Sequence, residues 1–358
     1  MGIAIGIECA RYLGMGAAVL SAGGGSYPYL EYLGTRELLA ERAPVNLVPP
    51  DSLPDDAHVA LVAMVGAPLP MFERFADPAH FVRPVGVLAR HLGITFDAVM
   101  GYEIGSMNGL IPVMVAAEMG RPLVDADTLG RSFPQVQMSG FAIAGLSMAP
   151  IAVSDIRAND LILTRTASGG WVEELLRPIA TVCGSIVAIC GAHTGREIKQ
   201  HAHLGTYSRA IRIGTAIVEA QARHDDPIAA LLSAERGRAL AKGKVVDVER
   251  RTAGGFVRGL ARIDVTGGGQ AVVHFQNEYS VVEVGERRLA MVPDLVAVFD
   301  SDRGEPLGTE ALRYGQHVTV VRLPPLARHV TPKALAVVGP RAFGFDFDYD
   351  PSNDEVNP

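Results

Sequence analysis

This sequence has few cysteines and no excess of basic residues. Its three cysteines are Cys9, Cys183 and Cys190, and so small and odd a number favours a reducing compartment over a disulfide framework. It has no basic excess, since 32 Lys and Arg face 39 Asp and Glu for a net charge of −7. Nucleic acid and an acidic membrane surface are therefore not expected as partners, and we expect a cytoplasmic protein.

The sequence also lacks a secretion signal and an uninterrupted apolar span. Its N-terminus has no basic stretch followed by an apolar core and a cleavage site. Three stretches are free of charge, residues 12–30, 132–154 and 178–195, but Gly, Pro or polar residues interrupt each of them. A membrane-spanning helix needs about 20 predominantly apolar residues. We expect these stretches to be buried loops and core elements around a pocket.

What the sequence does contain is apolar residues for two folded domains. Hydrophobic residues make up 48% of the 358 positions, and at about 150 residues per domain the length predicts two. The first half alternates predicted helices with strands. The helices are residues 7–20, 31–42 and 108–120, and the strands are residues 58–65, 96–100 and 123–124. We therefore predict an α/β domain with a mostly parallel or mixed sheet over residues 1–160.

Beyond residue 160 the pattern becomes mostly strand-like. The predicted strands are residues 161–166, 186–189, 244–249, 256–265, 271–276, 279–284, 295–299, 317–321 and 334–338. A single helix is predicted near residues 208–222, and the glycines at 267–269 predict a hairpin turn. We therefore predict a β-rich domain over residues 161–358 with one helical insertion.

The densest group of chemically capable side chains follows two of the predicted strands. Glu103 and Asn108 come after one, while Asp125, Asp127 and Arg131 come after the next. In open α/β sheets, ligands bind beyond the carboxyl ends of strands. Asp125 and Asp127, two residues apart, share a face if the backbone there is extended.

Such a cluster has two chemical uses. It could ligate a divalent cation through oxygen, or repulsion could raise one carboxyl pKa and so provide one base and one acid. The structural alternative is that Asp125 caps a turn, Asp127 pairs with Arg131, and Glu103 lies on the surface. The sequence leaves these alternatives open, and with them the question of a metal cofactor.

A second candidate group lies around Cys190. His193, His201 and His203, with Cys183 and Cys190, are possible ligands of a soft metal, but their spacings match no standard zinc module. Cys190 and His193 could also form a nucleophile pair, although no third orienting group can be named. The alternative is a polar loop with two buried cysteines that act as small hydrophobic residues.

Two further segments could shape a pocket. Gly23, Gly24 and Gly25 follow a helix rather than a strand, so they do not form a dinucleotide fingerprint, but their amides could bind an anion. The alternative there is a tight turn with close backbone packing. Asn277 and Glu278 interrupt a β run and could point into a pocket or form a bulge without function.

Several segments, in this order, resemble one known family. They include SAGGGSYPY, MVGAPLPMFER, GYEIGSMNGLIPVMVAAEMGRPLVDADTLGRSFPQVQM, HLGTYSRAIRIGTAI, FQNEY, PDLVAVFD and VGPRAFGFD. The family was first described as a domain of unknown function found beside hydantoinases, and it is named after S-methyl thiohydantoin desulfurase. The resemblance extends from about Gly14 to Phe345. It implies an α/β domain followed by a β-rich domain, and chemistry on a hydantoin-like ring.

The resemblance suggests hydrolysis at ring C2 of an S-alkyl thiohydantoin, with release of a thiol. Asp125 or Asp127 would be the base or a metal ligand, with Glu103 as partner. Asn108 would hold a ring carbonyl, and Arg131 would orient a carboxylate or stabilise the intermediate. The glycine turn, Asn277 and Glu278 would close the pocket around a small-molecule substrate.

A different class of function also fits. The chain could be a non-catalytic subunit that binds a hydantoinase-type partner or senses a small ligand. This alternative rests on the family's neighbourhood and on the lack of an unmistakable catalytic motif. In either case we expect a homo-oligomer, because most soluble oligomers are symmetric assemblies of one chain.

Overall fold

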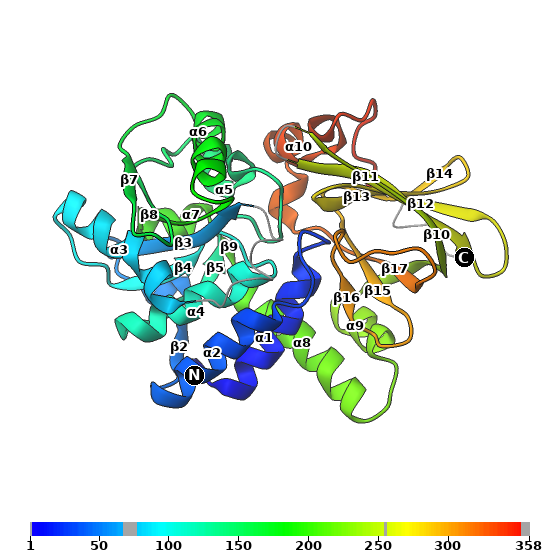
Figure 1. The fold of residues 1–358 in the computed structure, drawn as a ribbon, viewed down its shortest axis with the longest axis horizontal. Helices are drawn as coiled ribbons and strands as arrows, with labels where there is room; N and C mark the ends of the chain where they lie inside the picture. Colours follow the sequence, from blue (N-terminus) through cyan, green and yellow to red (C-terminus); the bar gives the residue numbers. More distant parts are fainter. Residues whose placement is uncertain (1, 67–76, 254–255, 352–358) are drawn as a thin grey trace.

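Two sheets organise the chain, which we describe from a computed structural model covering residues 2–66, 77–253 and 256–351. Figure 1 shows them side by side, an α/β domain built on sheet A and a β-rich domain built on sheet B. Sheet A is mixed and sheet B is antiparallel throughout its described pairs. The predicted fold class is therefore confirmed.

Sheet A has the strand order β1-β2-β5-β4-β3-β8-β6-β7, with β9 pairing β5. Its parallel centre consists of β2, β5, β4 and β3, and β8 joins it antiparallel to β3. The strands are β1 Ile3–Ile5, β2 Val45–Val48, β3 His58–Gly66, β4 Ala98–Gly101, β5 Leu123–Asp127, β6 Ile151–Ser154, β7 Asp160–Leu163, β8 Ile186–Thr194 and β9 His203–Leu204.

The central strand β3 is buried on both faces, as its apolar run predicts. Ala60, Val62 and Met64 pack into the core that contains α1, α4 and α8, whereas Leu61 and Ala63 pack into the core on the other face. The helices of this domain are α1 Ile7–Leu20, α2 Tyr29–Glu41, α3 Pro78–Leu92, α4 Met107–Met119, α5 Gly140–Ala144, α6 Gly169–Val182, α7 Gly195–His201 and α8 Thr206–Ala222.

Sheet B has the order β14-β13-β12-β11-β10-β17-β15-β16. Its strands are β10 Arg238–Ala253, β11 Phe256–Val265, β12 Gln270–Gln276, β13 Glu278–Val284, β14 Arg287–Met291, β15 Leu295–Asp300, β16 Pro306–Leu307 and β17 His317–Leu323. Helix α9, Pro227–Glu235, leads into it, and α10, Pro332–Val338, follows it. Short 3-10 turns complete the fold at η1 Pro50–Ser52, η3 Val136–Met138, η4 Ala327–Val330 and η5 Pro340–Phe343.

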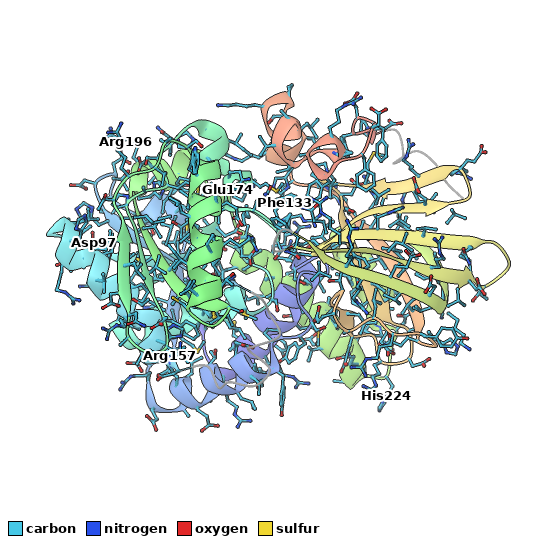
Figure 2. All side chains as sticks on the ribbon, turned by 45° about the horizontal axis from the view of Figure 1, so that its top comes forward. Asp97, Phe133, Arg157, Glu174, Arg196 and His224 are labelled. Atoms are coloured by element: carbon cyan, nitrogen blue, oxygen red, sulfur yellow. The ribbon has the colours of Figure 1, made fainter. Side chains whose placement is uncertain are left out.

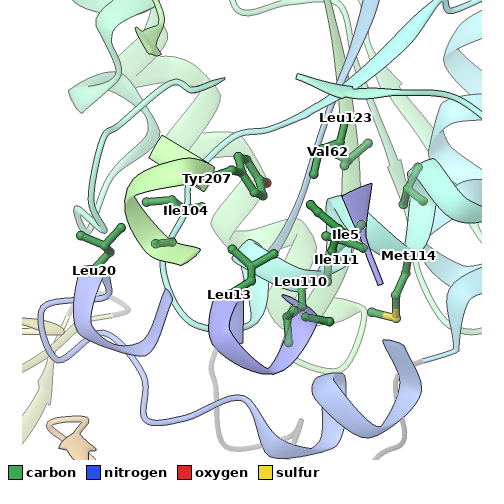
Figure 3. Packing of buried hydrophobic residues seen from close by; sticks show 14 of the residues in the cluster. Ile5, Leu13, Leu20, Val62, Ile104, Leu110, Ile111, Met114, Leu123 and Tyr207 are labelled. Carbon is green, nitrogen blue, oxygen red and sulfur yellow. The ribbon is translucent and has the colours of Figure 1, made fainter. Parts of the chain in front are cut away.

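Helices α1 and α8 pack with their backbones in direct contact. A Cβ atom on Gly16 would lie 1.8 Å from the carbonyl oxygen of Ala210, and one on Gly214 would lie 1.8 Å from that of Tyr12. Both positions therefore require glycine, because any side chain would separate the helices. Leu13 of α1 and Tyr207 of α8 lie in the surrounding core, which Figure 3 shows from close by.

Two predictions for the second half are wrong. Residues 334–338 lie in helix α10, because Thr331 caps a helix that has Pro332 in its first turn. The helix at 208–222 is not the single one, since α6, α7 and α9 are also present. Two of these helices have start signals in the sequence: Thr194 and Glu197 form a capping box in α7, and Asp226 caps α9.

The predicted domain boundary at residue 160 falls at the start of β7. Strands β8 and β9, which follow it in sequence, belong to sheet A, and β8 lies between β3 and β6 near the middle of that sheet. No helix in the described ranges is both long enough and apolar enough to cross a membrane.

We expect Gly16→Ala to lower the free energy of unfolding by about 1–3 kcal/mol, because its methyl group would push α8 away from α1. The matched control is Gly86→Ala in helix α3, where an added Cβ meets its nearest atom at 3.5 Å. That control should leave stability unchanged or raise it by up to about 1 kcal/mol. Denaturant unfolding measures both, and equal effects at the two sites would contradict the packing argument.

Candidate functional site

A cavity of about 600 Å³ lies between the two domains. The α/β domain contributes the ends of β3 and the loops that follow β4 and β5, and sheet B contributes Arg250, Val257 and Glu278. Phe133, which lines the cavity, is labelled in Figure 2 where the two domains meet. The cavity is therefore at the carboxyl ends of neighbouring parallel strands, where ligands bind in open α/β sheets.

Asn108 fixes the end of β3 and holds Glu103 in the cavity wall. Its Oδ1 accepts a hydrogen bond from the Met64 amide at 2.8 Å, and its Nδ2 donates to the Met64 carbonyl at 3.2 Å. The ladder between β3 and β4 ends at Gly101, so this side chain continues the pairing where β4 leaves. The same Nδ2 also donates to Glu103 Oε1 at 2.8 Å. Asn108 thus links the position of Glu103 to the end of β3.

Glu103 and Glu278 form a pair of carboxyl groups in this cavity. Burial raises the pKa of Glu103 to about 7, against the opposing effect of the Asn108 and Ser132 side chains. Burial raises the pKa of Glu278 to about 8, the charge of Glu103 adds to this rise, and Arg131 opposes it. Within the described residues, Glu278 Oε2 has no hydrogen-bond partner. One group can therefore be ionised while the other keeps its proton near neutral pH.

The glycine run brings the first helix against Glu278. A Cβ atom on Gly24 would lie 2.7 Å from Glu278 Oε1, and one on Gly23 would lie 2.5 Å from the ring of Tyr279. The Ala22 carbonyl accepts a hydrogen bond from the Tyr279 amide at 2.8 Å. Of the three glycines only Gly24 lines the cavity, while Gly25 abuts Ser106. The absence of side chains on Gly23 and Gly24 thus lets the backbone of this run pack directly against β13 of the second domain.

Asp127 is buried and ties two cavity loops together. Its carboxylate accepts hydrogen bonds from the amide of Ile104 at 2.9 Å and from that of Gly130 at 2.9 Å. These amides belong to the loops that carry Glu103 and Ser132. Burial raises the pKa of Asp127 to about 8, and the amides of Gly130 and Leu129 oppose the rise. Asp127 is not among the residues that line the cavity.

Asp125 holds the start of helix α8. Its Oδ1 accepts a hydrogen bond from the Ser208 amide at 3.0 Å, and its Oδ2 accepts one from the Ser208 hydroxyl. Its carbonyl accepts a hydrogen bond from the Gly205 amide. Asp125 therefore caps a helix, and it too is outside the cavity lining.

Arg131 is buried behind the cavity wall rather than in it. Its Nε donates to the Ser132 carbonyl at 3.0 Å, and its Nη1 donates to the Asp294 carbonyl of the second domain. Burial lowers the pKa of Arg131 to about 10, while the charges of Glu278 and Asp294 oppose this. Among described residues its Nη2 has no hydrogen-bond partner. Arg131 thus joins the domains and lowers the pKa of Glu278.

Asn277 reaches the cavity through a strained backbone conformation. Its φ is 57°, and its Oδ1 accepts a hydrogen bond from the Val257 amide at 2.9 Å. Its carbonyl accepts one from Thr309 Oγ1 at 2.8 Å. The geometry at the junction of β12 and β13 therefore turns Glu278 toward the cavity.

The candidate histidines and Cys190 make different contacts. His193 is hydrogen-bonded to Glu197 at 3.2 Å, and His203 packs on His329 with ring centroids 4.5 Å apart. Cys190 is fully buried, and burial raises the pKa of its thiol. In the described part of the chain, no group of three or more His, Cys, Asp or Glu side chains is arranged to hold a metal ion.

Sequence reasoning missed several cavity residues. Glu173 and Arg177 line it as an ion pair at i,i+4 spacing on α6, a helix that was not predicted. Arg177 also lies over the ring of Phe256 from the second domain at 4.4 Å. Arg250 and Glu310 line the cavity from sheet B and its loop. Only the Glu173–Arg177 spacing was a usable sequence signal.

Two family models match the chain. The model described as S-Me-THD-like, N-terminal domain, matches residues 9–165, and the model described as S-Me-THD-like, C-terminal domain, matches residues 167–352. No curated protein matches. A crystal structure described as a protein from Chromobacterium violaceum has a TM-score of 0.80 at 21% sequence identity, covering 97% of this chain and 98% of that one. This last likeness shows a shared fold.

The raised pKa of Glu103 predicts how the free energy of unfolding depends on pH. In the unfolded chain Glu103 ionises near 4.5, and in the folded protein near 7. As pH rises, Glu103 loses its proton in the unfolded chain before it does so in the folded protein. The free energy of unfolding therefore falls between about pH 4.5 and 7. The unfolding free energy of wild type relative to Glu103→Gln should fall by about 2–3 kcal/mol across this window.

Denaturant unfolding over a pH series measures this difference. Glu174→Gln, on the solvent-exposed face of α6, is the control and should track wild type at every pH. A difference between wild type and Glu103→Gln that does not change with pH would show that Glu103 ionises normally.

Proposed function

Since the chain belongs to the S-Me-THD-like family, we propose that it is a hydrolase that removes the thiol from an S-alkyl thiohydantoin. The observation that carries this proposal is the pair formed by Glu103 and Glu278, which come from different domains and face one cavity. Their raised pKa values provide a base and an acid at the same pH. The roles predicted for Asp125 and Asp127 stay predictions, and their placement outside the cavity favours the two glutamates.

The reaction requires water to replace sulfur at ring C2. In the first step, ionised Glu103 takes a proton from water as the water oxygen bonds to C2. Protonated Glu278 donates its proton to the ring nitrogen that was doubly bonded to C2. The product is a tetrahedral carbon that bears a hydroxyl and the alkylthio group.

In the second step the carbon–sulfur bond breaks. Glu103 returns its proton to the departing sulfur, and Glu278 takes the proton of the hydroxyl as the C2 carbonyl forms. The products are a hydantoin and a thiol, and both glutamates regain their starting states. Each group acts once as acid and once as base, so the cycle needs no further reactant.

The environment of each glutamate fits its role. The Asn108 hydrogen bond stabilises the charge of Glu103, which favours Glu103 as the ionised partner. Glu278 carries the unpartnered Oε2, which suits a group that holds a proton for the substrate. The apolar walls, including Ile186, Ile189 and Val257, exclude water from the ring.

We expect Glu103→Gln and Glu278→Gln each to lower kcat/KM for an S-methyl thiohydantoin by roughly 10²-fold or more, since neither amide can transfer a proton as required. The wild-type rate should depend on pH as a narrow bell with limbs near 7 and 8. Thiol release, with mass identification of the hydantoin, measures both quantities.

The control is Glu174→Gln, which should keep wild-type kinetics. Retained activity in both cavity variants would remove the two glutamates from the mechanism. A ring-opened product would assign the enzyme to hydantoin hydrolysis instead. Wild-type protein that releases no thiol from any ring, yet co-purifies with another protein, would favour the non-catalytic subunit.

A further inference from the structure

A second cavity, of about 290 Å³, adjoins the first. Residues 25–31, which connect the glycine run to the first turns of α2, form most of its wall. Ser106, Met107 and Glu310 line both cavities. A group attached to a ring in the first cavity therefore has a second cavity beside it.

The charge-bearing side chains that line this second cavity are both carboxyl groups. Glu31 and Glu310 line it, and none of the described lining residues is Lys, Arg or His. Glu310 is fixed in place because its Oε1 accepts hydrogen bonds from the Ser26 amide at 3.0 Å and the Ser26 hydroxyl at 2.8 Å. No described cation forms an ion pair with either carboxylate.

Glu31 is the more informative of the two. It is 4% exposed, and among described residues its carboxyl group has no hydrogen-bond donor besides its own backbone amide. Burial raises the pKa of Glu31, and a cation beside it would favour the ionised form. A buried carboxylate normally has a charged or hydrogen-bonding partner, because its desolvation is costly. The empty space beside Glu31 is where such a partner would fit.

Aromatic rings complete the wall. Tyr27 and Tyr29 both line the second cavity. Burial raises the pKa of the Tyr27 phenol, which therefore stays neutral. Tyr29 is 59% exposed, so the cavity opens to solvent beside it. Tyrosine faces attract organic cations, and this attraction adds to that of the carboxylates.

We propose that the second cavity binds an organic cation, an ammonium or guanidinium group, carried by the substrate as a substituent on its ring. Glu31 is the primary ligand of this group and Glu310 the secondary one. This inference rests on the proposed function and names its substrate class: S-alkyl thiohydantoins with a basic side chain. A free amine that is not part of the substrate carries the same cationic group. A binding experiment distinguishes a free amine from a substrate substituent.

The kinetic test compares three S-methyl thiohydantoins whose substituents end in an ammonium, a methyl or a carboxylate group. With wild type, we expect kcat/KM for the ammonium compound to exceed that of the methyl compound by about 10-fold or more, with the carboxylate compound the poorest. Glu31→Gln should remove most of this preference. Glu37→Gln, on the exposed face of the same helix, should preserve it. Equal rates for the three compounds, or a preference for the carboxylate, would overturn the inference.

A binding test keeps the inference separate from the proposed function. Calorimetry with butylammonium at neutral pH should detect binding to wild type and to Glu37→Gln, and its loss in Glu31→Gln. If no ring is hydrolysed while butylammonium still binds in a Glu31-dependent way, the proposed reaction fails and the cation site stands, occupied by a free amine. If butylammonium binds neither protein and no ring preference depends on Glu31, the cation site is wrong even if thiol is released.

Discussion

The cost of burying two carboxyl groups in one cavity determines how the rest of this site is built. Glu103 and Glu278 belong to different domains, and the charge of Glu103 makes ionisation of Glu278 less favourable. The surrounding hydrogen bonds offset this cost unequally. Asn108 stabilises one charge through the end of β3, whereas Glu278 keeps an unpartnered oxygen. This asymmetry gives the two groups different pKa values and hence different roles.

Much of the α/β domain could be predicted because its strands and helices have strong local signals. The run at residues 58–65 is apolar throughout since β3 is covered on both faces. Glu103 and Asn108 were also singled out, since polar residues after apolar strands mark ligand sites. Glu278 was singled out because it interrupts a β run. Residues such as Arg250 and Glu310 could not be found in this way, because only the packing of sheet B against the first domain brings them to the cavity.

The two aspartates show the limit of spacing arguments. Asp125 and Asp127 were predicted to follow a strand at residues 123–124, whereas β5 extends to Asp127 and includes both. Their spacing of two residues does not say which structure their shared face meets. In the fold this face meets backbone amides of α8 and of two loops. The same side chains would serve equally well as ligands or as hydrogen-bond acceptors for the main chain, and tertiary contacts alone distinguish these uses.

The insertion of β8 between β3 and β6 affects how the molecule can be divided. The two family models separate at residues 165 and 167, so β8 lies in the C-terminal match although it completes the sheet of the N-terminal one. A fragment ending at residue 165 would expose backbone edges on β3 and β6, which invite aggregation. Sheet A is therefore completed by residues from both family matches, and truncation at the sequence boundary would disrupt it.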